Sequence, residues 1–134
     1  MSEFATGYFT IDSAIRGLGL AEMEDRLGLP KGYLAGGATV LLLLRPPTLE
    51  EFEPRGSTRF ESGKGLSHSR LHETKAIPGA WSGRRLVKVR PRMRDAARTD
   101  FREALESRAE QWELLRPIPA RVLCVLEPGM RFWG

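Results

Sequence analysis

The sequence predicts an α+β domain in which a small mixed or antiparallel sheet is backed by one long helix. Three stretches lead to this prediction. Residues 38–45 (ATVLLLLR) are almost continuously apolar, which is typical of a strand covered on both faces. Residues 86–90 (LVKVR) alternate apolar and basic side chains, as a half-buried strand does. Residues 95–115 predict an amphipathic helix capped by Asp95, whose apolar stripe consists of Phe101, Leu105, Ala109, Trp112 and Leu115.

Shorter elements complete the expected domain. Residues 10–18 and 20–27 each place apolar side chains on one face, so we expect two short N-terminal helices. The second helix should end at Gly28, and Pro30 prevents its continuation. Residues 121–126 (RVLCVL) predict a further buried strand. No linker divides the chain, so we expect a single domain over residues 1–134.

The composition is that of a soluble globular protein. The chain is 41% hydrophobic and 28% charged, and no apolar run approaches the roughly 18 residues of a membrane span. The N-terminal residues lack the basic and then apolar pattern of a signal peptide. The single cysteine, Cys124, lies in the apolar run VLCVL and is expected to be a buried, unreactive thiol. We therefore expect no membrane partner and a site of action in a reducing cytosol, that of its own cell or of a target cell.

Positive charge is concentrated in residues 55–94, the basic stretch. It holds eleven Lys and Arg against two Glu, a net charge of +9, whereas the rest of the chain holds ten against fifteen, a net charge of −5. Such polarised charge favours a polyanionic partner, and basic side chains interleaved with aromatic ones suit a nucleic acid. The residues expected to hold nucleic acid are Arg59, Lys64, Lys75, Trp81, Arg84, Arg85, Lys88, Arg90, Arg92 and Arg94.

Two other interpretations of this charge stay open. In the first, the arginines pair within the chain with the acidic residues at 22–25 and 103–113, which lie in the predicted helices. In the second, the basic surface caps an acidic protein partner, as inhibitory or immunity-type proteins do. Either would leave the basic stretch without a role in nucleic-acid binding.

Both histidines of the chain lie in the glycine- and serine-rich part of the basic stretch, residues 56–83. Cleavage of a phosphodiester through a 2′-hydroxyl needs a base, an acid and a cation beside the phosphate. His68, His72 and Glu73 can supply the acid and the base, and Arg70 the cation. The sequence thus predicts a protein that engages nucleic acid or a nucleotide, in its most concrete form a toxin- or effector-type ribonuclease that needs no metal. The alternative is that both histidines are ordinary exposed loop side chains.

No metal site and no cofactor are predicted. His68, His72 and Glu73 offer metal ligands, but the order HExxH is absent, since Thr74 and Lys75 follow His72-Glu73. Residues 63–67 (GKGLS) lack the spacing of a phosphate-binding loop.

Residues 20–37 (LAEMEDRLGLPKGYLAGG) resemble the helix-turn-helix of phage-repressor-type DNA-binding proteins. The turn at 27–29 and the pair Tyr33-Leu34 match the apolar positions of that pattern, while Glu24 stands where the pattern has a small residue. The resemblance implies a second, non-catalytic function, that of a DNA-binding regulator whose recognition helix enters the major groove.

Overall fold

The computed structural model describes residues 3–54, 77–92 and 109–134, and these residues form mainly strands. The strands are β1 (Glu3–Ile11), β2 (Ala38–Leu43), β3 (Phe52–Pro54), β4 (Leu86–Pro91) and β5 (Trp112–Leu126). One α-helix, α1 (Leu20–Leu27), and two short 3₁₀ helices, Asp12–Ala14 and Gly79–Trp81, complete the described secondary structure.

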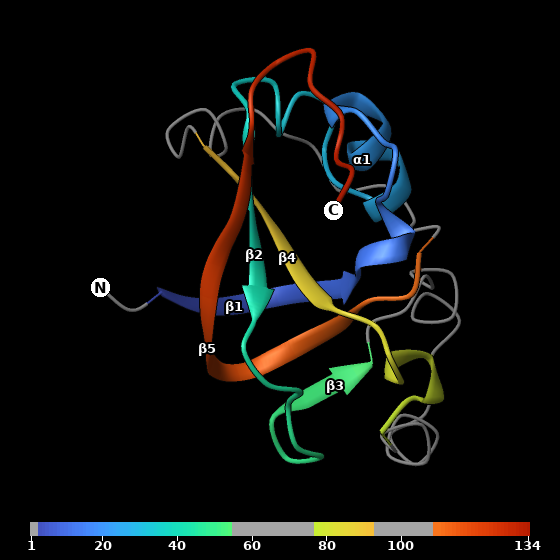
Figure 1. The fold of residues 1–134 in the computed structure, drawn as a ribbon, viewed down its shortest axis with the longest axis vertical. Helices are drawn as coiled ribbons and strands as arrows, with labels where there is room; N and C mark the ends of the chain where they lie inside the picture. The colour runs from blue at the N-terminus through green and yellow to red at the C-terminus, as the bar shows by residue number, and fades with distance from the viewer. Residues whose placement is uncertain (1–2, 55–76, 93–108) are drawn as a thin grey trace.

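Four of the strands close into an antiparallel barrel (Figure 1). The order around the barrel is β1, β4, β2, β5, and β5 then pairs again with β1, while β3 is added to β5. The long strand β5 makes this closure possible. Its first part pairs with β1 and β3, and after a bend its last part pairs with β2. Strand β2 is paired on both sides, with β4 and β5, whereas β1 and β4 pair with each other only at residues 10–11 and 86–87.

Two irregularities in the pairing produce the bends. Between Ala5 and Gly7 the partner in β5 changes from Ile118 to Leu114, so β5 has two more residues than β1 over this stretch. Gly7 has a φ of 74°, a backbone conformation that residues with a Cβ rarely adopt. A second shift in the pairing with β5 lies next to Val40 in β2. Bulges increase the local twist of a sheet, which a barrel of so few strands requires.

The buried side chains form two groups on opposite faces of the sheet. The first, the aromatic core, contains Phe9, Phe52, Trp81 and Trp112 with Ala5, Leu41, Leu43, Leu86, Leu114, Ile118 and Ala120. Its ring centroids lie 4.9 to 5.6 Å apart in tilted or edge-on contacts, the favourable geometry for aromatic pairs. The second, the helix-side core, lies beneath α1 and contains Ile15, Met23, Leu27, Leu34, Ala38, Val40, Val87, Val89, Ala109, Leu126 and Phe132.

Helix α1 has the bounds that the sequence predicts, but the residues directly after it form no second helix. It ends at Gly28, which has a φ of 69°. Residues 31–36 are turns. Glu24 explains them: its buried carboxylate accepts hydrogen bonds from the amides of Gly32 (3.0 Å) and Leu34 (2.7 Å). The recognition helix that the helix-turn-helix resemblance implies is therefore replaced by a turn held by a carboxylate.

The predicted α+β fold is wrong. Strands are present at 38–43, 86–91 and 121–126, but they belong to a closed barrel and not to a sheet backed by a helix. Of the predicted helix 95–115, residues 95–108 lie outside the described part, and residues 112–115 belong to β5. Trp112 and Leu114 face the core while Leu115 is exposed, the alternation of a strand. Likewise β1 extends to Ile11, where the sequence predicts the first helix.

Candidate nucleic-acid interface

The structure describes six of the ten residues predicted to hold nucleic acid: Trp81, Arg84, Arg85, Lys88, Arg90 and Arg92. The predicted catalytic residues His68, Arg70, His72 and Glu73 lie outside the described residues, as do Arg59, Lys64, Lys75 and Arg94. The proximity of the two histidines therefore stays a prediction.

Trp81 belongs to the aromatic core and not to a binding surface. Its side chain is only 7% exposed, and its ring contacts those of Phe9, Phe52 and Trp112 at centroid distances of 5.6, 4.9 and 5.3 Å. The prediction that Trp81 stacks on a base is thus wrong, because these contacts occupy the ring. The indole nitrogen is buried and has no hydrogen-bond partner within the described part of the chain.

The contact between Phe52 and Trp81 fixes the two ends of the histidine-containing segment. Phe52 shortly precedes residues 55–76 and Trp81 shortly follows them, and their ring centroids are 4.9 Å apart. The chain therefore leaves β3 and returns at the same end of the barrel (Figure 1). Arg84 is exposed at this return point, where its amide donates to the carbonyl of Trp81 (3.0 Å).

Three arginines on or beside β4 pair with acidic side chains of the same chain. Arg85 Nε lies 3.1 Å from Asp12 Oδ2, Arg90 Nη1 3.3 Å from Glu3 Oε1, and Arg92 Nη1 3.5 Å from Glu127 Oε1. Internal pairing therefore accounts for part of the positive charge.

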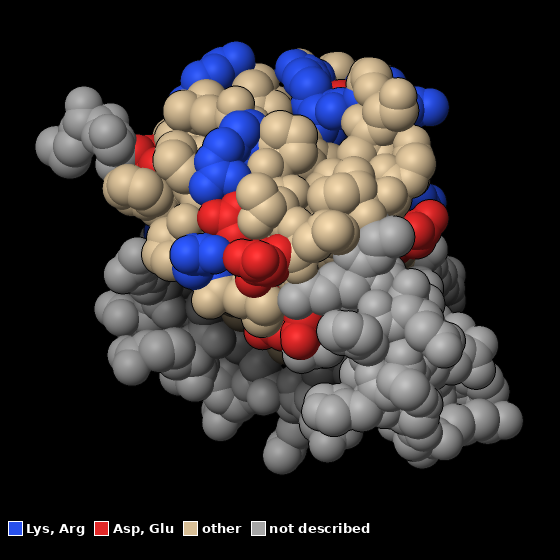
Figure 2. Space-filling view, turned by 90° about the horizontal axis from the view of Figure 1, so that it is seen from below, with Lys and Arg blue, Asp and Glu red and all other residues tan. Residues whose placement is uncertain are grey.

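The acids in these three pairs are not those that the sequence suggests. At 22–25, Glu22 pairs with Arg131 (2.8 Å) and accepts a hydrogen bond from the amide of Gly19, while Glu24 binds the turn at 31–36. In Figure 2, Lys and Arg side chains lie in separate groups with Asp and Glu among them, and not in one continuous basic area.

Lys88 points to the face of β4 opposite the helix-side core, as the alternation predicts, but it is largely buried there. The pairing of β1 with β4 covers only residues 10–11 and 86–87, and the Lys88 side chain extends toward β1 beyond it. A Cβ added at Gly7 would lie 3.1 Å from Lys88 Nζ. Burial, and to a lesser degree the charge of Arg90, lowers the pKa of Lys88 to about 8. Lys88 is therefore a weaker phosphate ligand than an exposed lysine.

A second cationic cluster, which the sequence does not suggest, surrounds Asp12. This buried carboxylate binds Arg16 Nη2 (3.0 Å) and Arg85 Nε (3.1 Å) through the same oxygen, Oδ2. Arg85 Nη2 also donates to the carbonyl of Gly134 (2.9 Å). The neighbouring Trp133 is 72% exposed. In the sequence, the only sign of this cluster is Trp133, an aromatic residue in a short C-terminal segment without periodicity.

Comparisons of the chain with protein-family models, with curated proteins and with solved structures found no match. No helix within residues 3–54, 77–92 and 109–134 is long and apolar enough to cross a membrane. In the same residues, no group of three or more His, Cys, Asp and Glu side chains is arranged to hold a metal ion. Cys124 is half-buried, and burial raises the pKa of its thiol, so the thiol is protonated at neutral pH.

Proposed function

We propose that the protein binds nucleic acid through residues 55–94 and cleaves RNA without a metal ion, as a toxin- or effector-type ribonuclease of the cytosol. The observation that carries this proposal is the Phe52–Trp81 contact. It joins the two ends of the segment that holds both histidines, beside the exposed Arg84. A segment whose two ends are anchored on a packed core is a common support for catalytic side chains.

In the proposed reaction, a base takes the proton of the 2′-hydroxyl, and the oxygen attacks the adjacent phosphorus. The P–O5′ bond breaks, and an acid protonates the leaving oxygen, which yields a 2′,3′-cyclic phosphate and a 5′-hydroxyl. His68, His72 and Glu73 are the proposed acid and base. Arg70 neutralises the charge that develops on the phosphate oxygens.

The binding partner is proposed to be nucleic acid because the described ion pairs offset only three of the eleven positive charges of the basic stretch. Arg85, Arg90 and Arg92 have acidic partners, whereas Arg84 is exposed and has no ion-pair partner among the described residues. No described feature favours the DNA-binding regulator, since residues 31–36 are turns. An acidic protein partner would make use of the same cations but would not be cleaved.

The test is cleavage of a single-stranded RNA by the purified protein in the presence of a chelator. We expect His68→Ala and His72→Ala each to lower the cleavage rate by about a hundredfold or more, the usual contribution of a general acid or base. Arg121→Gln, which removes an exposed arginine on β5, is the control and should leave the rate unchanged.

A substrate with a 2′-deoxy sugar at the cleaved position provides a chemical control, because it lacks the attacking oxygen. Three outcomes would each overturn the ribonuclease proposal: cleavage of that substrate, equal rates for the parent and both histidine variants, or no cleavage of RNA by the parent.

A further inference from the structure

Trp133 leaves a large aromatic side chain in water. Its exposure of 72% exceeds that of the other exposed large apolar side chains of the described residues, which range from 40 to 56%. Proteins that bind single strands use exposed aromatic side chains beside cationic ones to contact nucleobases.

The segment that carries Trp133 is held firmly on both sides. Phe132 is fully buried in the helix-side core, and its amide and carbonyl bond to Leu18 (3.0 Å) and Gly17 (2.6 Å). Arg131 Nη1 donates to the carbonyl of Gly17 (2.8 Å). The Trp133 ring lies beside Gly17, where an added Cβ would be 3.5 Å from the ring carbon Cζ3. The indole is therefore exposed on a fixed backbone and not on a loose tail.

Two guanidinium groups lie beside the next residue. Arg85 Nη2 donates to the carbonyl of Gly134, and Arg16 Nε is 3.8 Å from the position that a Cβ of Gly134 would take. Both arginines bind the single carboxylate of Asp12, so the three side chains carry a net charge of +1. Both are also well exposed, 46% for Arg16 and 39% for Arg85, and so present unused N–H donors to solvent.

We propose that Trp133 stacks on a base of a single-stranded nucleic acid while Arg16 and Arg85 contact the neighbouring phosphate. Aromatic stacking with flanking cations is the means by which proteins bind single strands without reading their sequence. Asp12 acts as a positioning residue, since it holds both guanidinium groups beside Gly134, the residue that follows Trp133. The site deepens the proposed function, on which it rests for the class of ligand, and it uses none of the histidines.

The test uses a short single strand of oligo(dT) as the probe, because it has no 2′-hydroxyl and cannot be cleaved by the proposed reaction. Trp81 and Trp112 are buried, so stacking should quench the fluorescence of Trp133 alone. We expect oligo(dT) to quench the parent and to leave Trp133→Phe unquenched. By anisotropy of labelled oligo(dT), Trp133→Ala should weaken binding about tenfold and Arg16→Gln severalfold.

Two matched controls separate stacking from general effects of charge and apolar surface. Leu115→Ala removes another exposed apolar side chain, and Arg121→Gln another exposed arginine; both should change the affinity less than twofold. A duplex of the same strand should bind more weakly, because its bases are not free to stack.

Four outcomes would each overturn the stacking site. The first two are equal losses of affinity for Trp133→Ala and Leu115→Ala, and quenching that is retained in Trp133→Phe. The others are equal binding of duplex and single strand, and no binding of oligo(dT) by the parent. The two proposals fail separately. Loss of cleavage in His68→Ala together with Trp133-dependent binding of oligo(dT) supports both, whereas Trp133-dependent binding by a parent that cleaves no RNA supports only the stacking site.

Discussion

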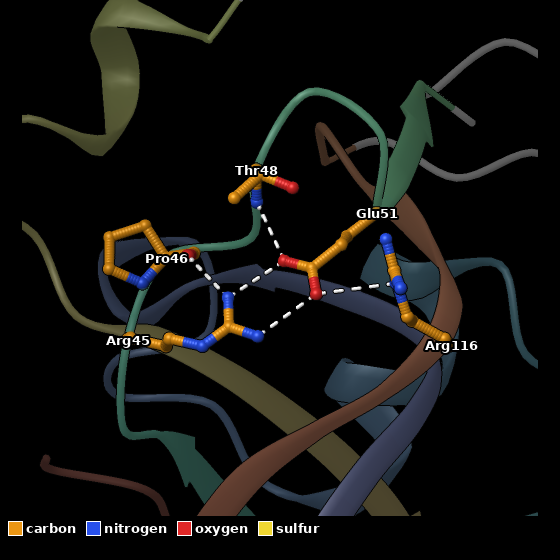
Figure 3. A network of polar contacts seen from close by, with 5 residues as sticks. All are labelled: Arg45, Pro46, Thr48, Glu51 and Arg116. Carbon is orange, nitrogen blue, oxygen red and sulfur yellow. Dashed lines mark hydrogen bonds and ion pairs between the residues drawn. The ribbon is translucent and has the colours of Figure 1, made fainter.

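Glu51 and Asp12 are both almost completely buried, with side-chain exposures of 7% and 6%, and each lies within ion-pair distance of two arginines. At Glu51 both oxygens are bonded: Arg45 donates to each (2.7 and 2.9 Å) and the amide of Thr48 donates to Oε1 (2.9 Å), while Arg116 Nε lies 3.4 Å from Oε2 (Figure 3). At Asp12 one oxygen binds both arginines, and Oδ1 is buried without a partner among the described residues.

The difference between the two carboxylates shows what each cluster is suited for. The Glu51 cluster joins the loop after β2 to β5, and its hydrogen bonds are satisfied within the protein. A buried and fully bonded carboxylate of this kind contributes to structure. Among the described residues, the Asp12 cluster leaves one carboxylate oxygen without a hydrogen bond, and its arginines are partly exposed. This arrangement suits the proposed stacking site, in which Arg16 and Arg85 contact a phosphate.

The largest expected effect comes from breaking the Glu51 cluster. Glu51→Gln removes the charge that both arginines bind, so the midpoint of thermal unfolding at pH 7 should fall more than for Asp12→Asn. The neighbouring substitution Glu50→Gln, at an exposed position, is the control and should have little effect.

The same variant has a defined dependence on pH. Hydrogen bonds from Arg45 and Thr48 lower the pKa of Glu51 to about 2, below its ordinary value of 4.5. Its contribution to stability is therefore fully present above pH 4.5 and is lost as the pH falls from 4.5 to about 2. Thermal unfolding of parent and variant should converge over that range. A difference in midpoint that stays constant down to pH 2 would contradict the assignment.

The next largest effect on stability is expected at Lys88, which has no carboxylate partner among the described residues. The pKa of Lys88 is lowered from 10.5 to about 8, so the folded protein binds this proton more weakly than the unfolded chain does. Protonated Lys88 thus costs stability below pH 8, and the cost disappears as the pH rises from 8 to 10.5. Lys88→Met should raise the free energy of unfolding at pH 7 by up to about 3 kcal/mol.

Urea unfolding of the parent and of Lys88→Met at pH 7 and pH 10.5 measures this difference. The gain should be present at the lower pH and nearly absent at the higher one. An equal gain at both values would mean that packing, and not charge, is responsible.

The smallest effect on stability, and the most informative one for the comparison, is expected for Asp12→Asn. The variant keeps the shape of the side chain but no longer holds Arg16 and Arg85 by charge. If Asp12 positions them, oligo(dT) binding should weaken severalfold in the anisotropy assay although the net charge has become more positive. Tighter binding would show that Asp12 only offsets positive charge and would contradict the positioning role.

The strands at 38–43 and 86–91 follow from local patterns, because a continuous apolar run and a strict alternation each have one simple structural interpretation. The strand at 112–115 does not follow from a local pattern. Trp112 and Leu115 fit a helical stripe, while Trp112 and Leu114 fit one face of a strand, and pairing with β1, more than a hundred residues away in sequence, decides between them.

The candidate sites were harder to predict for the same reason. Trp81 looks like an interface residue because basic residues follow it in sequence, and only its distant neighbours Phe9 and Trp112 place it in the core. The ion pair of Asp12 with Arg85 joins residues 73 positions apart. No local pattern contains this contact, so no local pattern shows that Arg85 lies beside the C-terminal segment.

The double pairing of β5 also determines the order in which the chain can fold. β1, near the start of the chain, finds its longest partner only in residues 112–120, and β2 needs residues 120–126. During synthesis neither strand can pair with β5 until residues 112–126 have been made. Folds dominated by such distant contacts form slowly, on the order of milliseconds to seconds. Before β5 is made, the apolar strand β2 has one unpaired edge. An unpaired apolar edge is prone to aggregation, so the nascent protein is most exposed to aggregation at this stage.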